Sequence, residues 1–335
     1  MIYILVLLNN YTNKVLIKFF SKKPKFDTMS KPNNKVKYSV KDYKNEIHRL
    51  AKSNESNFII EENWYLLHWI YRIRKASCAR GLPIGFIQPD FLWVIYRPLM
   101  RNKKLWRTDE DINEAVNLWC THRAEAEEKY GHISDWDVSC VTDMSTLFQY
   151  KFYFNDDISH WNVSKVINMN SMFSRATAFN HDIGQWNVRN VNDMSHMFDG
   201  AFIFNQAIDS WDVSNVINMN SMFASAYAFN QAIGTWDVSK VTNMSNMFGG
   251  ARSFNQAIGD WNVSKVTNMA QMFRKTFAFN QPIGDWNVSN VTDMWLMFGY
   301  TRSFNQYIRS WNVFNVKNMK YMFYEAQAFN QPLWD

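Results

Sequence analysis

The sequence has few cysteines and none of the patterns by which cysteine and histidine build metal sites or catalytic centres. Its three cysteines, Cys78, Cys120 and Cys140, show no CxxC spacing, and its seven histidines are scattered. This usage argues against a disulfide framework and against a zinc site. No HExxH, G-x-S-x-G, P-loop or dinucleotide-binding motif occurs either. We therefore expect a protein that is not an enzyme and that takes no cofactor, metal or small-molecule substrate.

A long hydrophobic run is also missing from the beginning of the chain. The first residues, MIYILVLLNN, hold seven apolar residues after Met1. This stretch is too short to span a bilayer, and it lacks the preceding positive charge and small-residue cleavage site of a signal peptide. Met29 offers an alternative start, followed by SKPNNKVKYSV. The compartment and the true start therefore stay open.

Positive charge is concentrated in the first part of the chain. Residues 1–52 hold twelve Lys and Arg against three Asp and Glu, whereas residues 131–335 hold thirteen against sixteen. The basic run predicts a flexible arm over residues 1–52, in which residues 14–52 could contact nucleic acid or an anionic membrane. Only Tyr38 and Tyr43 interleave with the later charges, which gives little support for base stacking.

What the sequence has in abundance is a 25-residue repeat. Tryptophan recurs every 25 residues through eight units of residues 131–335, with no insertion or deletion, and asparagine recurs at a second position. Such self-similarity predicts a solenoid, in which each unit buries its apolar face against its neighbours. The predicted structural ladder comprises Trp136, Trp161, Trp186, Trp211, Trp236, Trp261, Trp286 and Trp311, and Asn155, Asn180, Asn205, Asn230, Asn255, Asn280, Asn305 and Asn330.

One unit, residues 236–260, shows the elements that we expect in all of them. The alternation of Trp236 and Val238 predicts a short parallel strand. Apolar residues at i, i+3, i+4 and i+7, beginning at Met244, predict one face of a short helix. Gly249 and Gly250 weaken a helix here, so a 3-10 segment stays open as the alternative. The expected fold class is therefore an α/β solenoid, leucine-rich-repeat-like, of short parallel strands and short helices.

Residues 53–130 carry helical signals that do not repeat. Apolar segments are broken at residues 81–83 and at Pro98, and Thr108 or Asp109 could cap a further helix. We interpret this block as a small N-terminal helical domain that also covers the open end of the first repeat, since a solenoid needs a cap there.

Methionine pairs recur in the units and need to be weighed as a copper site. Fifteen of the eighteen methionines lie in the repeats, and M-x-x-M is a spacing that can bind Cu(I). Each pair stands beside a phenylalanine, as Met169 and Met172 stand beside Phe173, with no Cys or His recurring in register. Core packing against aromatic rings is the favoured role.

Variable, outward-facing positions are where a repeat scaffold places its specificity. The last two units are enriched there in large side chains, which suits a protein-binding patch. The same side chains would also shield the C-terminal edge, and both roles stay open. The set comprises Trp295, Tyr300, Tyr307, Arg309, Phe314, Tyr321 and Tyr324.

The repeat frame, I-x-x-W-D/N-V-S-x-V-x-x-M-x-x-M-F-x-x-A-x-x-F-N-Q, is best seen in residues 233–256. It resembles the BspA family of leucine-rich-repeat surface proteins and the related repeats of mycoplasma lipoproteins. The resemblance covers residues 131–335, and residues 112–133 are similar to the helical segment that often precedes such arrays. It implies a leucine-rich-repeat-like solenoid used in adhesion or host-protein binding at a cell surface, without catalysis. An intracellular location stays equally open, because no export signal or anchor is recognisable.

The leading hypothesis is a non-enzymatic recognition scaffold that binds other proteins through the solenoid surface. The alternative is an adaptor docked to nucleic acid or to an anionic membrane through its basic N-terminal arm.

Overall fold

The computed structural model describes residues 105–333, and the predicted basic arm and the first part of the predicted helical block lie outside them. The helices of the described residues all precede the repeats. They are α6, Ile112–Thr121, α7, Arg123–Tyr130, and the 3-10 helix η1, Ile133–Asp135. Residues 105–333 form isolated β-bridges but no extended β-strand.

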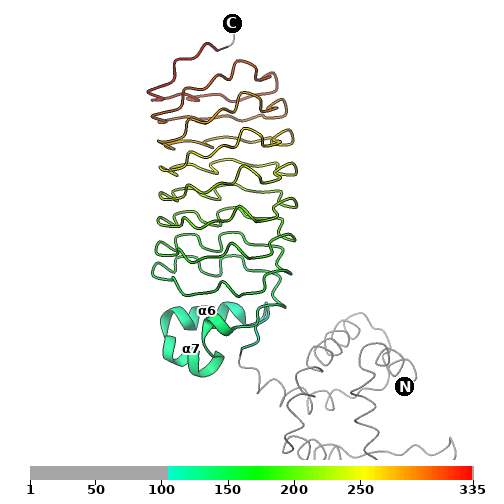
Figure 1. Cartoon of the computed structure of the whole chain (residues 1–335), viewed down its shortest axis with the longest axis vertical. Coiled ribbons are helices and arrows are strands. Elements are labelled where there is room, and N and C mark those ends of the chain that lie inside the picture. Colours follow the sequence, from blue (N-terminus) through cyan, green and yellow to red (C-terminus); the bar gives the residue numbers. More distant parts are fainter. Residues whose placement is uncertain (1–104, 334–335) are drawn as a thin grey trace, which may run out of the picture. The chain divides into compact units, whose positions relative to one another are not determined.

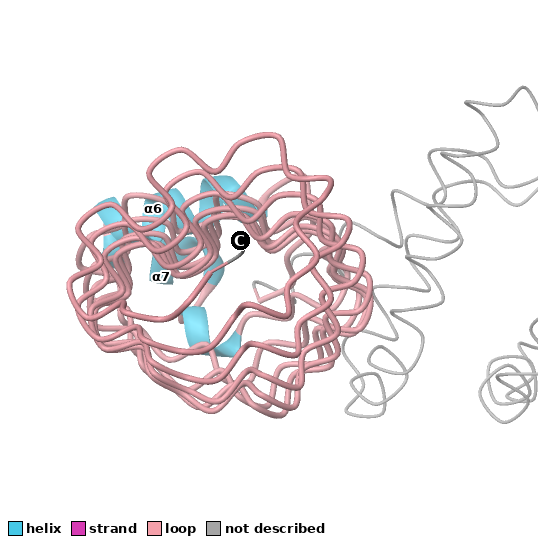
Figure 2. Cartoon of the chain, turned by 90° about the horizontal axis from the view of Figure 1, so that it is seen from above, coloured by secondary structure: helices cyan, strands magenta, loops and turns pink. Residues whose placement is uncertain are grey.

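From Trp136 onward the chain winds through stacked coils of 25 residues, which we number 1 to 8 from their tryptophans (Figure 1). Seen along the stack, the coils overlie one another around a common interior (Figure 2). Neighbouring coils meet in one parallel bridge at the Asp or Asn seven residues after the tryptophan, from Asp143 with Asn168 through to Asp293 with Asn318. The predicted strand at the tryptophan itself is not formed.

Each coil fills the interior with the same apolar side chains. The first phenylalanine of every coil stacks on its equivalent in the next, as Phe198 does on Phe223 with ring centroids 5.6 Å apart. The second lies closer within its own coil, with Phe223 and Phe229 3.9 Å apart. The methionine pairs are fully buried beside these rings in the inner coils, where flexible thioether side chains fill the space between aromatic faces. Burial of this continuous core is the main stabilising term of the stack.

One segment of each coil supplies most of the hydrogen bonds between coils. In coil 4 the N–H groups of Met219, Ser221, Phe223 and Ser225 donate to carbonyl oxygens of coil 5 at 3.0, 2.9, 2.8 and 2.7 Å. The same four bonds recur at every junction from coil 1 to coil 8. These N–H groups always point to the following coil and the carbonyls to the preceding one, so the stack has a direction.

These bonds explain why the predicted short helix is replaced by a series of turns. Ser221 and Ser225 adopt positive φ values of 53° and 55°, and the N–H of Met222 returns to the carbonyl of Met219 at 3.2 Å. A helix would direct every N–H within its own segment, whereas here alternate N–H groups are turned toward the next coil. The side chains predicted to face the core, Met219 and Met222 among them, are fully buried.

Helices α6 and α7 cover the first coil (Figure 1). Ile112, Val116 and Trp119 of α6 and Tyr130 of α7 are buried in the same hydrophobic cluster as the repeats, and the Trp119 ring meets Trp136 edge-on at 6.0 Å. The compact unit that contains the repeats begins at residue 105. Residues 105–130 therefore share their core with coil 1.

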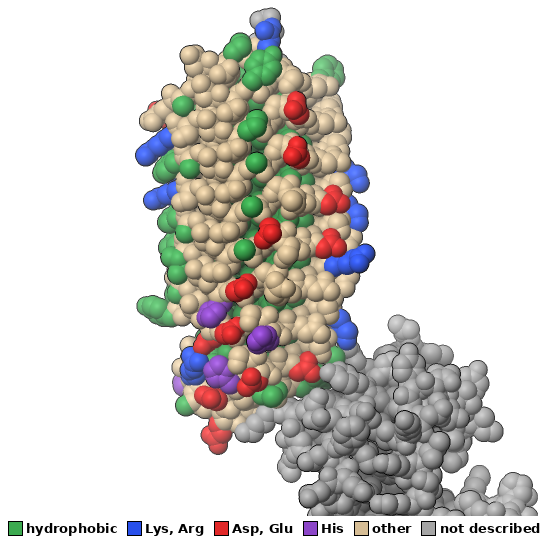
Figure 3. Space-filling model, viewed as in Figure 1, with side chains coloured by type: hydrophobic (Ala, Val, Ile, Leu, Met, Phe, Trp, Pro, Cys, Tyr) green, Lys and Arg blue, Asp and Glu red, His purple; other side chains and the backbone are tan. Residues whose placement is uncertain are grey.

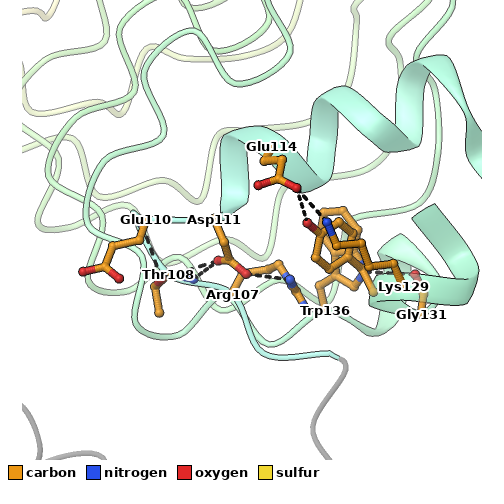
Figure 4. Close-up of polar contacts among 9 residues, drawn as sticks. Arg107, Thr108, Glu110, Asp111, Glu114, Lys129, Gly131 and Trp136 are labelled. Atoms are coloured by element: carbon orange, nitrogen blue, oxygen red, sulfur yellow. Dashed lines mark hydrogen bonds and ion pairs between the residues drawn. The ribbon is translucent and has the colours of Figure 1, made fainter. Parts of the chain in front are cut away.

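Polar contacts hold the cap together (Figure 4). Arg107 is buried, pairs with Asp111 at 2.7 Å and lies 4.4 Å above the Tyr130 ring. Glu114 accepts hydrogen bonds from Lys129 at 2.7 Å and from the Tyr130 hydroxyl at 2.9 Å. Because these residues come from the segment before α6, from α6 and from α7, the contacts join all three.

Asp109 takes the place of the missing preceding coil. Its Oδ1 accepts the N–H groups of Thr142 at 2.7 Å and Asp143 at 3.1 Å, and its Oδ2 accepts the Thr142 hydroxyl at 2.8 Å. One coil further on, the equivalent N–H of Ile167 donates to the backbone carbonyl of Thr142 at 2.9 Å. The carboxylate thus imitates the acceptor that a neighbouring coil would present.

Candidate protein-binding surface

The tryptophan ladder lies inside the stack. From Trp161 to Trp311, every indole Nε1–H donates to the carbonyl of the isoleucine 28 residues earlier, at 3.0–3.2 Å. The rings themselves are buried. Each indole therefore satisfies a carbonyl three residues before the tryptophan of the preceding coil, which serves stacking and leaves no face for a partner.

The asparagine ladder also joins coil to coil. From Asn155 to Asn305, each side-chain Oδ1 accepts the backbone N–H of the next asparagine at 2.8–3.0 Å. From coil 3 onward a neighbouring glutamine adds to it: Gln231 donates its Nε2 to the carbonyl of Asn205 at 2.8 Å. Asparagine suits this position because one amide can satisfy a backbone donor that a bend leaves without a partner.

The Asp or Asn after each tryptophan closes a local turn. In coil 5, Asp237 Oδ1 accepts the N–H of Ser239 at 3.0 Å. Hydrogen bonds from the hydroxyl and backbone of Ser239 lower the pKa of Asp237. A second Asp or Asn column, seven residues after tryptophan, does the same, as Asn243 does for Ser245 at 3.0 Å. Since only an acceptor oxygen is needed, Asp and Asn interchange freely.

The described residues bring together no group of three His, Cys, Asp or Glu side chains that could hold a metal ion. Cys120 and Cys140 are free thiols. Burial raises the pKa of Cys120 to about 11, so this thiol stays protonated at neutral pH and is a weak nucleophile.

Three residues of the predicted binding patch come together at the C-terminal end. The Tyr300 and Tyr324 rings meet edge-on with centroids 5.3 Å apart, and Tyr321 meets Tyr324 edge-on at 5.7 Å. Tyr321 is 62% exposed and Tyr324 46%. We call these three residues the tyrosine cluster.

The other four residues of the predicted patch do not join this cluster. Trp295, Tyr307, Arg309 and Phe314 stand 9, 21, 23 and 3 residues after the tryptophan of their coil. Among the described residues, no ring contact links Trp295, Tyr307 or Phe314 to the tyrosines. Phe314 is 90% exposed. The four residues thus occupy separate positions around the coil.

A second surface feature was not singled out in the sequence. The position 16 residues after tryptophan holds Phe202, Tyr227, Arg252, Phe277 and Arg302 in coils 3 to 7, and we call these five residues the aromatic–arginine column. Phe202 and Tyr227 stack in parallel at 4.7 Å. The Arg252 guanidinium lies 4.2 Å above Tyr227, and that of Arg302 lies 4.2 Å above Phe277.

A separate cation–aromatic contact involves a residue of the tyrosine cluster. Lys275 of coil 6 lies 5.5 Å from the centroid of the Tyr300 ring in coil 7. In the view of Figure 3, Lys and Arg side chains lie along the edges of the stack, and Asp and Glu form a row between them. The sequence signal for the column was available, because one variable position carries only Phe, Tyr or Arg in five successive units.

Across residues 105–333 we find no helix that combines the length and the apolar character needed to cross a bilayer.

Comparison with known protein families identifies one family to which the repeats belong. A family model described as "Mycoplasma protein of unknown function, DUF285" matches residues 116–235 and again residues 228–335. The two matches together span about two thirds of the chain, beginning within α6, and the chain belongs to this family. No curated protein and no solved structure matches it significantly.

Proposed function

We propose that this chain is a non-enzymatic recognition scaffold that binds another protein through the surface formed by the tyrosine cluster and the aromatic–arginine column. The coils would then form a leucine-rich-repeat-like solenoid of the BspA type, and binding would serve adhesion or host interaction. Family membership supports a repeat protein of the mycoplasma type, and the resemblance of the repeat frame supports the finer assignment.

The observation that carries the proposal is the succession of partly exposed aromatic and exposed cationic side chains over adjacent coils. Tyrosine and arginine are the residues most enriched in binding hot spots. Here the tyrosine and arginine side chains project from a stack that is held rigid by hydrogen bonds between coils. A partner would therefore meet preorganised groups, and little conformational entropy would be lost on binding. Neither the buried tryptophans nor the asparagine ladder offers such a surface.

The test is retention of a partner by the immobilised full-length protein. We compare the unaltered chain with the double variant Tyr321→Ala/Tyr324→Ala, and with the control Ile167→Ala/Ile217→Ala. The control removes exposed apolar side chains of 49% and 50% exposure from another position of the coil. We expect the unaltered chain and the control to retain the same proteins from cell-surface extracts. The amount retained by the tyrosine variant should be at least about tenfold lower.

The proposal fails if every retained protein binds all three forms equally. Circular dichroism of each variant shows whether the stack is intact, so a loss of fold is not mistaken for a loss of contact.

A further inference from the structure

We infer that the aromatic–arginine column recognises an extended acidic segment of a partner protein, with Arg252 and Arg302 each receiving a carboxylate. The inference rests on the proposed protein-binding function and adds the chemistry of the partner. It is carried by the charge, the stacking geometry and the spacing of these side chains.

The first argument is the absence of internal counter-ions. Arg252 and Arg302 are exposed, and neither of them forms an ion pair within the described residues. Elsewhere on the stack Arg189 approaches Asp212 to 3.6 Å. Residues 131–335 carry thirteen basic against sixteen acidic residues, so the column gathers unpaired positive charge on a stack of the opposite net sign. Such a patch complements an anionic partner.

The second argument is how the guanidinium groups are held. Arg252 lies over Tyr227 and Arg302 over Phe277, both at 4.2 Å. A guanidinium stacked on a ring keeps its N–H edge free, and its planar fork matches a carboxylate with two parallel hydrogen bonds. The ring contact also limits the rotamers of the arginine, so less side-chain entropy is lost when the carboxylate binds.

The third argument separates a protein partner from a nucleic acid. Single-stranded nucleic acids stack their bases on open aromatic faces. Tyr227 lies between Phe202 and Arg252, at 4.7 and 4.2 Å. Phe277 lies between Arg252 and Arg302, at 5.8 and 4.2 Å. Both faces of the Tyr227 and Phe277 rings are therefore covered within the column, which leaves charged edges for an acidic peptide and little open ring surface on these two residues for bases.

The fourth argument is spacing. Arg252 and Arg302 stand two coils apart, which corresponds to about 10 Å if the paired chains follow the ordinary parallel spacing. In a polyproline II segment, residues i and i+3 lie on one side of the chain about 9 Å apart. An extended partner with an acidic residue at every third position would therefore place successive carboxylates on the two arginines.

The experiment measures binding of labelled peptides to the full-length protein by fluorescence anisotropy at low salt. One peptide is (Glu-Pro-Pro)4, and the second has the same composition with its glutamates in one block. A twelve-nucleotide oligo-dT is the third probe. The protein variants are Arg252→Ala/Arg302→Ala, the charge-preserving Arg252→Lys/Arg302→Lys, and the control Lys165→Ala/Lys265→Ala, which removes two exposed cations from another position of the coil. The basic arm is identical in all forms, so a difference between the forms reports on the substituted positions.

We expect the spaced peptide to bind more tightly than the blocked one. Its affinity should fall at least about tenfold in the alanine variant, by an intermediate factor in the lysine variant and less than about twofold in the control. The inference is overturned if the control loses as much as the alanine variant, if the two peptides bind alike, or if only oligo-dT depends on the column.

These outcomes are separate from those of the partner-retention test. If peptide affinity does not depend on Arg252 and Arg302 while retention of a partner still depends on Tyr321 and Tyr324, only the acidic-segment inference is wrong. If the peptides depend on the column but no protein depends on the tyrosine cluster, it is the proposed function that falls.

Discussion

Coils 1 and 8 are built on the same 25-residue frame but meet different neighbours. The apolar side chains of coil 1 are closed off by α6 and α7, and Trp136 and Phe148 are buried. In coil 8, Phe323 and Phe329 are only partly buried. The same residue type at the same repeat position is therefore shielded at one end and half-exposed at the other, so its contribution to stability is set by the adjacent coil.

The two ends also differ in backbone polarity. Asp109 supplies an acceptor to coil 1, whereas the N–H groups of Met319, Tyr321, Phe323 and Glu325 in coil 8 have no acceptor within the described residues. Their equivalents in coils 1 to 7 all donate to the next coil. The N–H groups at each end of the stack therefore need acceptor oxygens: a carboxylate supplies them at coil 1, and backbone carbonyls would have to supply them at coil 8. Two copies of coil 8 cannot pair through these four positions, because both would present N–H donors.

The largest expected effect concerns the phenylalanine column. Phe223→Ala in coil 4 removes a fully buried ring that stacks on both neighbouring coils, and we expect it to lower the free energy of unfolding by about 3–5 kcal/mol. Phe323→Ala at the equivalent place in coil 8 should cost about 1–2 kcal/mol, because that ring has one neighbouring coil and is partly exposed. Urea unfolding followed by tryptophan fluorescence measures both, and equal losses would contradict the contrast between inner and terminal coils.

The asparagine ladder sharpens the same contrast with a smaller effect. Asn230 Oδ1 accepts the N–H of Asn255 at 3.0 Å and the side chain of Gln256 at 3.0 Å, so Asn230→Ala leaves a part-buried donor without a partner and should cost about 2 kcal/mol. Within residues 105–333 the Asn330 side chain accepts no hydrogen bond from another coil, and Asn330→Ala should change the stability by less than about 0.5 kcal/mol. Asn230→Asp keeps the acceptor oxygen and should recover part of the loss. A cost at Asn330 equal to that at Asn230 would show that the amide acts within its own coil.

Much of this architecture can be read from the sequence, because the period and the buried positions follow from residue type. The 25-residue spacing locates every inward-facing residue, and Met244, Met247 and Phe248 are fully buried. Their helical spacing did not yield a helix, because the backbone bonds are made between coils and not within the segment. Of the positions with positive φ in the coils, only those of Gly200 and Gly250 carry glycine, and the others carry Thr, Ser, His, Asn, Gln, Leu, Tyr, Arg, Lys or Glu, so glycine marks few of them.

The surface was harder to predict. Tyr300, Tyr321 and Tyr324 were selected for their size, and the structure brings them together. The aromatic–arginine column was missed because its members lie 25 residues apart, and contacts such as that of Arg252 with Tyr227 appear only when one position is followed through successive units. Exposed variable positions in a repeat protein are therefore better compared along the stack than within a unit.

The next prediction concerns Asp109, whose carboxylate accepts hydrogen bonds from coil 1 at the N-terminal end of the stack. Asp109→Ala leaves the N–H groups of Thr142 and Asp143 without the carboxylate, and we expect a loss of about 1–2 kcal/mol, as for other capping side chains. Asp109→Asn retains one acceptor oxygen and should cost less. Asp260→Ala removes an exposed carboxylate from an inner coil and serves as the charge-matched control. Equal unfolding free energies for Asp109→Ala and this control would mean that coil 1 needs no substitute for a neighbour.

The smallest expected effect concerns one pair of positions that is occupied differently in an early and a late coil. Positions 10 and 13 after tryptophan hold Tyr321 and Tyr324 in coil 8, but His196 and Asp199 in coil 3, where Nδ1 and Oδ2 lie 3.3 Å apart. The hydrogen bond to Asp199 raises the pKa of His196 above its ordinary value of 6.5. A raised folded-state pKa means that the protonated pair stabilises the folded state fully below pH 6.5, and that this contribution is lost as the pH rises through the folded value.

Asp199→Asn should therefore lower the stability at pH 5.5 and leave it nearly unchanged at pH 8.5, with a small difference because the imidazole is partly exposed. NMR titration of His196 in the unaltered chain and in Asp199→Asn measures the cause directly, and urea unfolding at the two pH values measures its consequence. The variant should titrate at lower pH than the unaltered chain. A variant that destabilises equally at both pH values would assign Asp199 a packing role independent of the histidine charge, and coil 3 would then differ from coil 8 at this position only in side-chain shape.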